Sequence, residues 1–204
     1  MDDLPDPRRN RNISIGERVG DLLYFPTINM LYSTSADSTV RSWSLNTLDA
    51  VNIFEGHDGY VCGITYQPSE ESTCLYSGGD DCTIKLWNED IATCIHTFKE
   101  HTGPVNGLTS SSSHLYSAST DGTIRVWDLL LRTCVRTFVA HEDGVWSLTL
   151  FSDGRLATSG GDGKIRLWAN PVLYVERTVE LSGHTGCVTK LIVSGGVLFP
   201  RAQT

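Results

Sequence analysis

Short runs of apolar, β-branched and aromatic residues alternate with polar turn residues along most of the chain. Residues 101–138 show the pattern clearly, with the runs VNGLT, HLYSAST, TIRVW and TCVRTF separated mostly by polar residues. Such runs are typical of strands, and apolar positions at helical spacing are hard to find. This stretch therefore predicts four short strands.

One heptapeptide recurs along the chain in nearly the same form. The copies are DSTVRSW at 37–43, DCTIKLW at 81–87, DGTIRVW at 121–127 and DGKIRLW at 162–168. Their final Trp residues are 44, 40 and 41 residues apart. Four histidines keep a similar rhythm, with intervals of 44, 40 and 43 residues: His57, His101, His141 and His184. Self-similarity at a fixed period predicts a repeat architecture with one small unit per period.

The start of each heptapeptide predicts a tight turn. Asp121-Gly122 and Asp162-Gly163 fit a two-residue hairpin turn, in which positive φ angles are required. The other two copies have Ser38 and Cys82 in place of the glycine. We expect those turns to be mildly strained or of another type.

These units resemble the WD40 family of β-propellers, which has four strands per unit and Gly-His and Trp-Asp dipeptides. Gly56-His57 and Gly183-His184 match the first dipeptide, and Trp127-Asp128 matches the second. Elsewhere only the His or the Trp remains. The resemblance covers roughly residues 16–199 and implies an all-β propeller.

The resemblance also implies a structural role for the repeated polar residues. In the family, a hydrogen-bonded chain runs from the turn Asp through the His and a Ser or Thr to the Trp indole. The matching sets are His57, Ser77, Asp81 and Trp87; His101, Ser117, Asp121 and Trp127; and His141, Thr158, Asp162 and Trp168. A hydrolase needs only one Ser-His-Asp set, so three copies favour structure over catalysis.

A basic residue stands two positions before each repeated Trp, and we expect these side chains to cover the sheet with their stems while the charged heads reach water. They are Arg41, Lys85, Arg125 and Arg166.

The repeats predict about four and a half four-stranded blades. The expected units are 16–53, 57–98, 101–138, 141–181 and a partial unit at 184–199, with a disordered arm at 1–15 and an irregular C-terminus at 200–204. Ile15 stands where the first unit should have its histidine, and Pro200 stands where the last should have its structural serine. Proline cannot donate to a central strand ladder.

Propellers of this type commonly close with seven blades, so an incomplete ring or a fragment is expected. Three explanations remain open, in order of preference. The chain is a fragment or truncated product of a longer WD40 protein, an oligomer that completes the ring between chains, or an unusually small closed ring.

The resemblance implies a non-enzymatic scaffold or adaptor that binds partner proteins or peptides. Ubiquitin-ligase substrate adaptors and signalling scaffolds are alternatives within this class, and a hydrolase is less favoured. Family members meet partners at rim positions near the first strand and before the turn Asp, here chiefly Tyr60, Asp80, Asn106, Thr120 and Trp146. Trp146 lies outside the repeated register, and aromatic residues are enriched at binding hot spots. Packing in the channel or on a neighbouring strand is an equally weighted alternative for Trp146.

Charge, hydropathy and cysteine spacing argue against several other classes of partner and site. The formal net charge of −8 argues against nucleic acid as a partner, and no apolar run is long enough to cross a membrane. The six cysteines include no C-x-x-C pair, which favours reduced, mostly buried thiols over a metal site or disulfides. No cofactor is expected. Without a secretory leader, a cytoplasmic protein is expected, with the nucleus as the alternative.

Overall fold

The computed structural model describes residues 17–68, 73–173 and 175–203. These residues form 18 strands joined by turns and loops, and they contain no helix. The expected arm at 1–15 and Ile15 lie outside the described residues.

The strands form four antiparallel sheets of four strands each and one hairpin. The first two sheets contain β1 (Val19–Phe25), β2 (Met30–Ser35), β3 (Val40–Ser44) and β4 (Ala50–Phe54), then β5 (Val61–Pro68), β6 (Thr73–Gly79), β7 (Ile84–Asn88) and β8 (Thr93–Phe98). The next two contain β9 (Val105–Ser110), β10 (His114–Ser119), β11 (Thr123–Asp128) and β12 (Thr133–Val139), then β13 (Val145–Leu150), β14 (Leu156–Gly160), β15 (Ile165–Ala169) and β16 (Glu176–Leu181). The hairpin contains β17 (Val188–Ser194) and β18 (Val197–Ala202).

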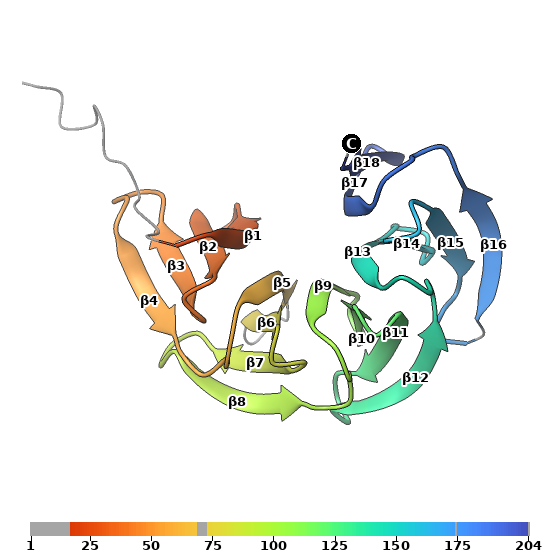
Figure 1. The fold of residues 1–204 in the computed structure, drawn as a ribbon. Helices are drawn as coiled ribbons and strands as arrows, with labels where there is room; N and C mark the ends of the chain where they lie inside the picture. The colour runs from red at the N-terminus through yellow and green to blue at the C-terminus, as the bar shows by residue number, and fades with distance from the viewer. Residues whose placement is uncertain (1–16, 69–72, 174, 204) are drawn as a thin grey trace, which may run out of the picture.

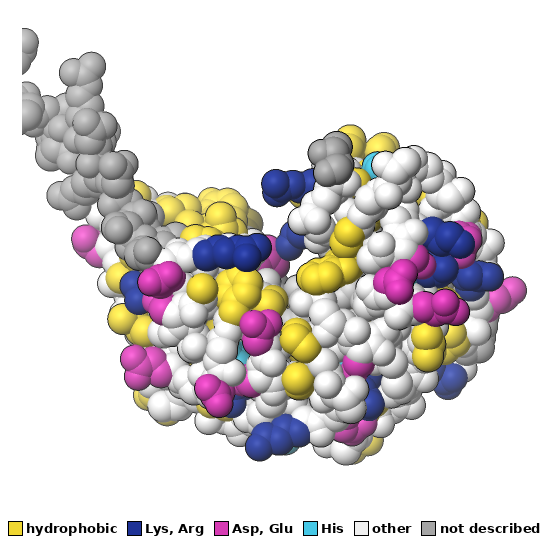
Figure 2. All heavy atoms as spheres, viewed as in Figure 1, with side chains coloured by type: hydrophobic (Ala, Val, Ile, Leu, Met, Phe, Trp, Pro, Cys, Tyr) yellow, Lys and Arg dark blue, Asp and Glu magenta, His cyan; other side chains and the backbone are white. Residues whose placement is uncertain are grey.

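The sheets stand side by side as blades of an open ring (Figure 1). The first strand of each sheet lies toward the centre, and the fourth strand lies at the periphery. The ring stays open between β1 and the β17–β18 hairpin, and the space-filling view shows a notch there (Figure 2). The predicted propeller with about four and a half blades is therefore confirmed, whereas the three explanations for the open ring stay predictions.

The cores lie between neighbouring sheets, and each repeats one aromatic contact. Trp87 packs edge-on against Phe54 of the preceding sheet, with ring centroids 5.7 Å apart. Trp127 packs against Phe98 at 5.2 Å in the same way, and the next sheet repeats the pair with a tilted contact. Burying an indole at about 25 cal/mol per Å² of apolar surface contributes at most about 4–6 kcal/mol to the stability of the fold. The repeated Trp therefore joins its own blade to the blade before it.

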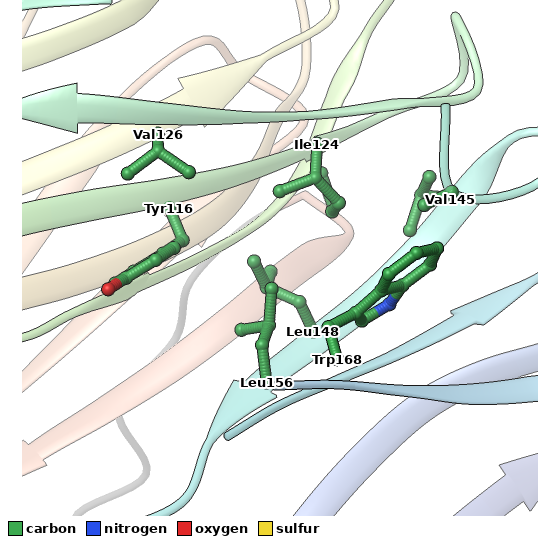
Figure 3. Close-up of a cluster of buried hydrophobic side chains, with 9 residues drawn as sticks. Tyr116, Ile124, Val126, Val145, Leu148, Leu156 and Trp168 are labelled. Carbon is green, nitrogen blue, oxygen red and sulfur yellow. The ribbon is translucent and has the colours of Figure 1, made fainter. Parts of the chain in front are cut away.

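Figure 3 shows one such core, between the third and fourth sheets. Tyr116, Ile124 and Val126 come from the third sheet, and they face side chains of the fourth. The facing residues include Leu148, Leu156 and Trp168. Each blade thus buries its apolar face only against a neighbour, as stacked repeats require.

The inner strands approach one another closely because small residues line their contacts. A Cβ added at Gly63 would lie 3.0 Å from the Cα atom of Gly107 on β9. A Cβ at Gly107 would in turn lie 2.9 Å from a methyl group of Leu148 on β13. Glycine at these two positions lets the backbones pack against each other around the centre.

The turns between the second and third strands differ from the predicted two-residue type. The Gly79 amide donates to the Thr83 carbonyl in the second sheet, and the Gly160 amide donates to the Lys164 carbonyl around Asp162-Gly163 in the fourth, so each bond closes a loop of three residues. Only the last loop residue has a positive φ, at 61° for Cys82 and 84° for Gly122. A three-residue loop ending in a left-handed residue is the next most common hairpin connection. The prediction of a two-residue turn was wrong, and Ser38 and Cys82 adopt the strained conformation without being glycine.

The C-terminal hairpin corrects a second expectation. Residues 200–202 were expected to be irregular, yet they belong to β18, and Pro200 pairs with Leu191 as Thr158 pairs with Leu148. Pro200 therefore does occupy the place of the structural hydroxyl residue. Among the described residues β18 pairs only with β17, and an edge strand tolerates a proline.

The cysteines are also less buried than expected. All six are free thiols and all are partly exposed, although Cys74, Cys94 and Cys134 pack against the cores between blades.

Candidate functional site

The structure brings together the members of all three predicted polar sets. In the second sheet, His57 Nδ1 lies 2.8 Å from Asp81 Oδ2, and His57 Nε2 lies 2.8 Å from Ser77 Oγ. The indole of Trp87 donates to the same Ser77 oxygen at 2.8 Å. The third sheet repeats the set with His101, Asp121, Ser117 and Trp127, and the fourth with His141, Asp162, Thr158 and Trp168.

The donors and acceptors of the set in the second sheet leave one consistent assignment. The carboxylate of Asp81 can only accept, so Nδ1 of His57 carries the proton. The Trp87 indole can only donate, so the Ser77 hydroxyl gives its own hydrogen to Nε2. Every polar side-chain atom of this set therefore has a hydrogen-bond partner. The set is buried, and there an unpaired polar group would lower the stability of the fold by about 1–3 kcal/mol.

The environment keeps His101 and His141 neutral and the aspartates charged. Burial lowers the pKa of His101 and of His141, although the neighbouring aspartates act to raise it. Burial acts to raise the pKa of Asp121, but hydrogen bonds from Thr123 and His101 outweigh it and hold that pKa at about 2. Hydrogen bonds from His57, the Asp58 amide and Thr83 hold the pKa of Asp81 even lower against the same effect of burial. The hydroxyls of these sets belong to fully buried residues, so a substrate cannot reach them.

The basic residues before each Trp are paired rather than simply reaching water. Arg41 binds Asp37 at 2.8 Å, Arg125 binds Glu100, and Arg166 binds Asp162 at 2.6 Å and Glu180 at 2.9 Å. Lys85 donates to Thr97 at 3.5 Å. The expectation of heads in solvent was wrong for the three arginines, because each has an acidic side chain within reach.

Tyr60, Asp80 and Thr120 lie on one rim of the ring, and Asn106 and Trp146 lie beside that rim, at the starts of the inner strands β9 and β13. We define this rim as the loops before the inner strands (55–60, 99–104 and 140–144) and the turns that begin at residues 80, 120 and 161. Asp80 is exposed; its amide donates to the Tyr60 carbonyl at 2.8 Å, and Cys62 Sγ donates to its carboxylate at 3.5 Å. Burial and the nearby Asp80 raise the pKa of Cys62 to about 12, so Cys62 remains a thiol.

Contacts between neighbouring blades make the rim continuous. Asn106 on β9 donates its side-chain amide to the Val145 carbonyl on β13 at 2.8 Å. A Cβ at Gly144 would lie 3.2 Å from the Cα atom of Thr120, so the loop before β13 rests on the turn of the third sheet. Asn106 and Thr120 are both half-buried. The structure therefore places Asn106 and Thr120 beside the start of β13.

Trp146 differs from the other four tryptophans in its exposure. Its side chain is 38 % exposed, whereas Trp43, Trp87, Trp127 and Trp168 are at most 5 % exposed. It is the second residue of β13 and lies next to Asn106's acceptor, Val145. The equally weighted alternative, in which Trp146 packs in the channel or on a neighbouring strand, stays a prediction, since exposure to the open centre of the ring is compatible with it.

Tyr60 has a partner that spacing in the sequence did not indicate. The guanidinium of Arg18 lies over the Tyr60 ring, 5.4 Å from its centroid. Arg18 precedes β1, whereas Tyr60 precedes β5, so only the curvature of the ring brings them together. Tyr60 is consequently half-covered by the chain itself.

A separate cavity of about 300 Å³ lies at the junction of the third and fourth sheets. It is lined by Val139, Ala140, His141, Glu142, Arg166, Trp168 and Arg177. Its two arginines already bind Glu180.

The described residues contain no group of three or more His, Cys, Asp or Glu side chains that could hold a metal ion. They also contain no helix that is long and apolar enough to cross a membrane.

Comparisons with known proteins agree with this architecture. The chain superimposes on a structure titled "Structure of U3-55K" with a TM-score of 0.76 and 24 % sequence identity, over 87 % of this chain and 56 % of that one. The chain thus spans about half the length of that protein, and the likeness concerns the fold. No curated protein sequence matches the chain closely enough to count as a relative.

The family comparison concerns the repeats themselves. The model of the family described as "WD domain, G-beta repeat" matches residues 49–88, 92–128 and 132–169. Its first match runs from the outer strand β4 to the third strand β7, so a sequence repeat contains the last strand of one blade and three strands of the next. The three matches cover more than half of the chain, and the chain belongs to the WD40 repeat family.

Proposed function

We propose that the chain is a protein-interaction scaffold that holds partner proteins or peptides on the rim around Trp146. WD40 propellers generally serve as interaction scaffolds, and this step extends that role to one surface of this chain. The exposure of Trp146 carries the proposal. An indole left 38 % open beside polar groups has the composition of a binding hot spot, and it differs from four tryptophans used for packing.

The rest of the rim supports a rigid platform. The polar sets behind it satisfy the loops and turns with hydrogen bonds of 2.7–2.9 Å, so the rim is ordered before a partner arrives. A preorganised surface loses little conformational entropy on binding. Assignments to a ubiquitin-ligase adaptor or to a signalling scaffold belong to the same proposal, since both use such a platform.

Affinity capture with quantitative mass spectrometry tests the proposal. The bait is the chain itself, compared with Trp146→Ala and with a control, Leu130→Ala. Leu130 is 90 % exposed and lies in the β11–β12 turn, at the other end of the strands from the rim. Partners lost with Trp146→Ala and retained with Leu130→Ala support the proposal. Unchanged partners on a folded Trp146→Ala variant would place binding elsewhere.

A hydrolase is the competing class, and the geometry disfavours the repeated sets as its catalytic site. Ser77, Ser117 and Thr158 are completely buried, and each hydroxyl is committed to a histidine and an indole. Assays with ester and peptide substrates on the same preparation check this class directly.

A further inference from the structure

The rim carries exposed carboxylates that the chain leaves unpaired. Asp58, Asp80, Glu142 and Asp143 are exposed, and none forms an ion pair with any residue that the structure describes. Glu142 and Asp143 lie in the loop that leads into β13, four and three residues before Trp146. Glu142 lines the cavity that also contains Arg166 and Arg177, so Asp143 is the carboxylate of this loop that has no arginine in the same cavity.

Four cations near the rim bind acidic side chains of the chain itself, whereas Lys99 in the loop 99–104 is exposed and forms no ion pair among the described residues. Lys164 binds Glu180 at 2.7 Å, and Arg166 binds both Glu180 and Asp162. Arg125 binds Glu100, and Lys190 binds Asp21 at 2.6 Å. The negative charge around Trp146 is thus not balanced by these side chains.

The chain itself contains an example of how this rim receives a cation. Arg18 lies over the face of Tyr60, at a distance typical of a cation–π contact. Trp146 follows the first valine of its inner strand, just as Cys62 and Asn106 follow theirs, so it faces the same part of the ring. Among the described residues no cation and no aromatic ring stacks on Trp146.

We propose that the rim binds a positively charged segment of a partner protein, with a Lys or Arg side chain over the face of Trp146 and the carboxylate of Asp143, three residues earlier in the same loop, attracting the same segment. This inference rests on the proposed function and names the chemical class of the partner. An indole is the best cation–π acceptor among side chains, and carboxylates on the same surface strengthen the attraction. The rim carboxylates of Asp58 and Asp80 would contact further basic residues along the same segment.

The arrangement favours a basic peptide over other cationic ligands. A metal ion needs several carboxylates around one point, whereas these four are spread along loops and turns of different blades. Phosphate backbones would be repelled by the same charges.

Titration with a matched pair of peptides tests the inference. The first peptide alternates Arg and Ser, and the second has citrulline in place of every Arg, which keeps the shape and removes the charge. Binding is followed by calorimetry and by Trp fluorescence, in which Trp146 is the exposed reporter because the other indoles are buried. We expect the Arg peptide to bind at least about tenfold more tightly than the citrulline peptide, and the difference to shrink with added salt.

Variants separate this site from general attraction to an acidic protein. Trp146→Ala and Asp143→Asn should each weaken binding of the Arg peptide by about threefold to tenfold. Asp90→Asn, which removes one exposed charge in the β7–β8 turn away from the rim, should leave it nearly unchanged. Equal losses for Asp143→Asn and Asp90→Asn, or equal binding of the two peptides, would overturn the inference. If a partner captured through Trp146 bound with a neutral or acidic segment, the scaffold proposal would stand and this inference would fall.

Discussion

Lys190 Nζ lies 2.6 Å from Asp21 Oδ1, which joins the innermost strand of the last blade to that of the first across the open ring. The two residues occupy equivalent positions, each being the second residue after the first valine of its strand. The corresponding residues of the intervening blades are Gly63, Gly107 and Ser147. These five equivalent positions form one row around the centre of the ring. Small residues occupy its three middle positions, and the ion pair joins its two ends.

Breaking this pair should loosen the arc without unfolding it. Partly exposed ion pairs contribute about 0–1 kcal/mol, so Lys190→Ala should change the free energy of unfolding by no more than that. The distance between spin labels placed on β4 and β16 should nevertheless become longer and more broadly distributed. Arg155→Ala, which removes the exposed pair with Asp153, is the control. An unchanged label distance would mean that packing alone sets the curvature.

Trp127→Ala should destabilise the chain far more than Arg125→Ala. Trp127 is fully buried and packs on Phe98, so its loss should cost about 3–5 kcal/mol. Arg125 forms a pair with a half-exposed Glu100, and its Nε atom is buried without a hydrogen-bond partner among the described residues, so its loss should cost about 1 kcal/mol or less. Urea unfolding measures both, and equal costs would contradict the packing described for the indole.

Stability should fall as the solution becomes acidic, in two stages. The pKa values of His101 and His141 are lowered in the folded chain. Below about pH 6.5 the unfolded chain therefore binds more protons than the folded chain, and the free energy of unfolding falls. The pKa values of Asp81, Asp121 and Asp162 are also lowered, which adds a second loss below about pH 4.

Urea unfolding at a series of pH values from about 8 to about 3 measures both stages. Asp121→Asn should flatten the acid stage, and Asp90→Asn should leave its slope unchanged. A free energy of unfolding that stays constant over this range would refute the assignment of neutral histidines and charged aspartates.

The turn of the second blade should be stabilised by glycine. Cys82 has a φ of 61°, a left-handed conformation that costs a side-chain-bearing residue about 1–2 kcal/mol. Cys82→Gly removes this strain but also raises the conformational entropy of the unfolded chain. We therefore expect the free energy of unfolding to rise by only about 0.5–1 kcal/mol. Gly122→Ala should do the reverse, because its φ is 84° and its Cβ would lie 2.5 Å from the His141 carbonyl oxygen. Thermal unfolding that shows a loss for Cys82→Gly would contradict the strain.

The fold and the polar sets were predictable because they are local and repeated. The spacing of Trp87, Trp127 and Trp168 reflects one blade each, and any single repeat already contains the His, hydroxyl and Asp that meet within it. The length of the turn was not predictable, since Asp-Gly suits both two-residue and three-residue loops and only the Gly160–Lys164 hydrogen bond distinguishes them.

Contacts between blades could not be predicted from the sequence. Arg18 meets Tyr60, and Lys190 meets Asp21, only because the ring has a particular curvature, which no spacing within a repeat encodes. For the same reason the exposure of Trp146 could be stated only as one of two alternatives. Glu142 and Asp143 were visible as adjacent charges, but their adjacency did not indicate that Glu142 lines a cavity with Arg166 and Arg177.

Site-specific photocrosslinking tests the central claim, contact between a partner and the rim at Trp146, most directly. A benzophenone amino acid replaces Trp146 in one variant and Leu130 in another, and each is irradiated with a captured partner. We predict a crosslinked product from position 146 and none from position 130, because only the rim end of the strands contacts the partner. Crosslinking from position 130 with none from position 146 would contradict the account and place the partner on the opposite end of the blades.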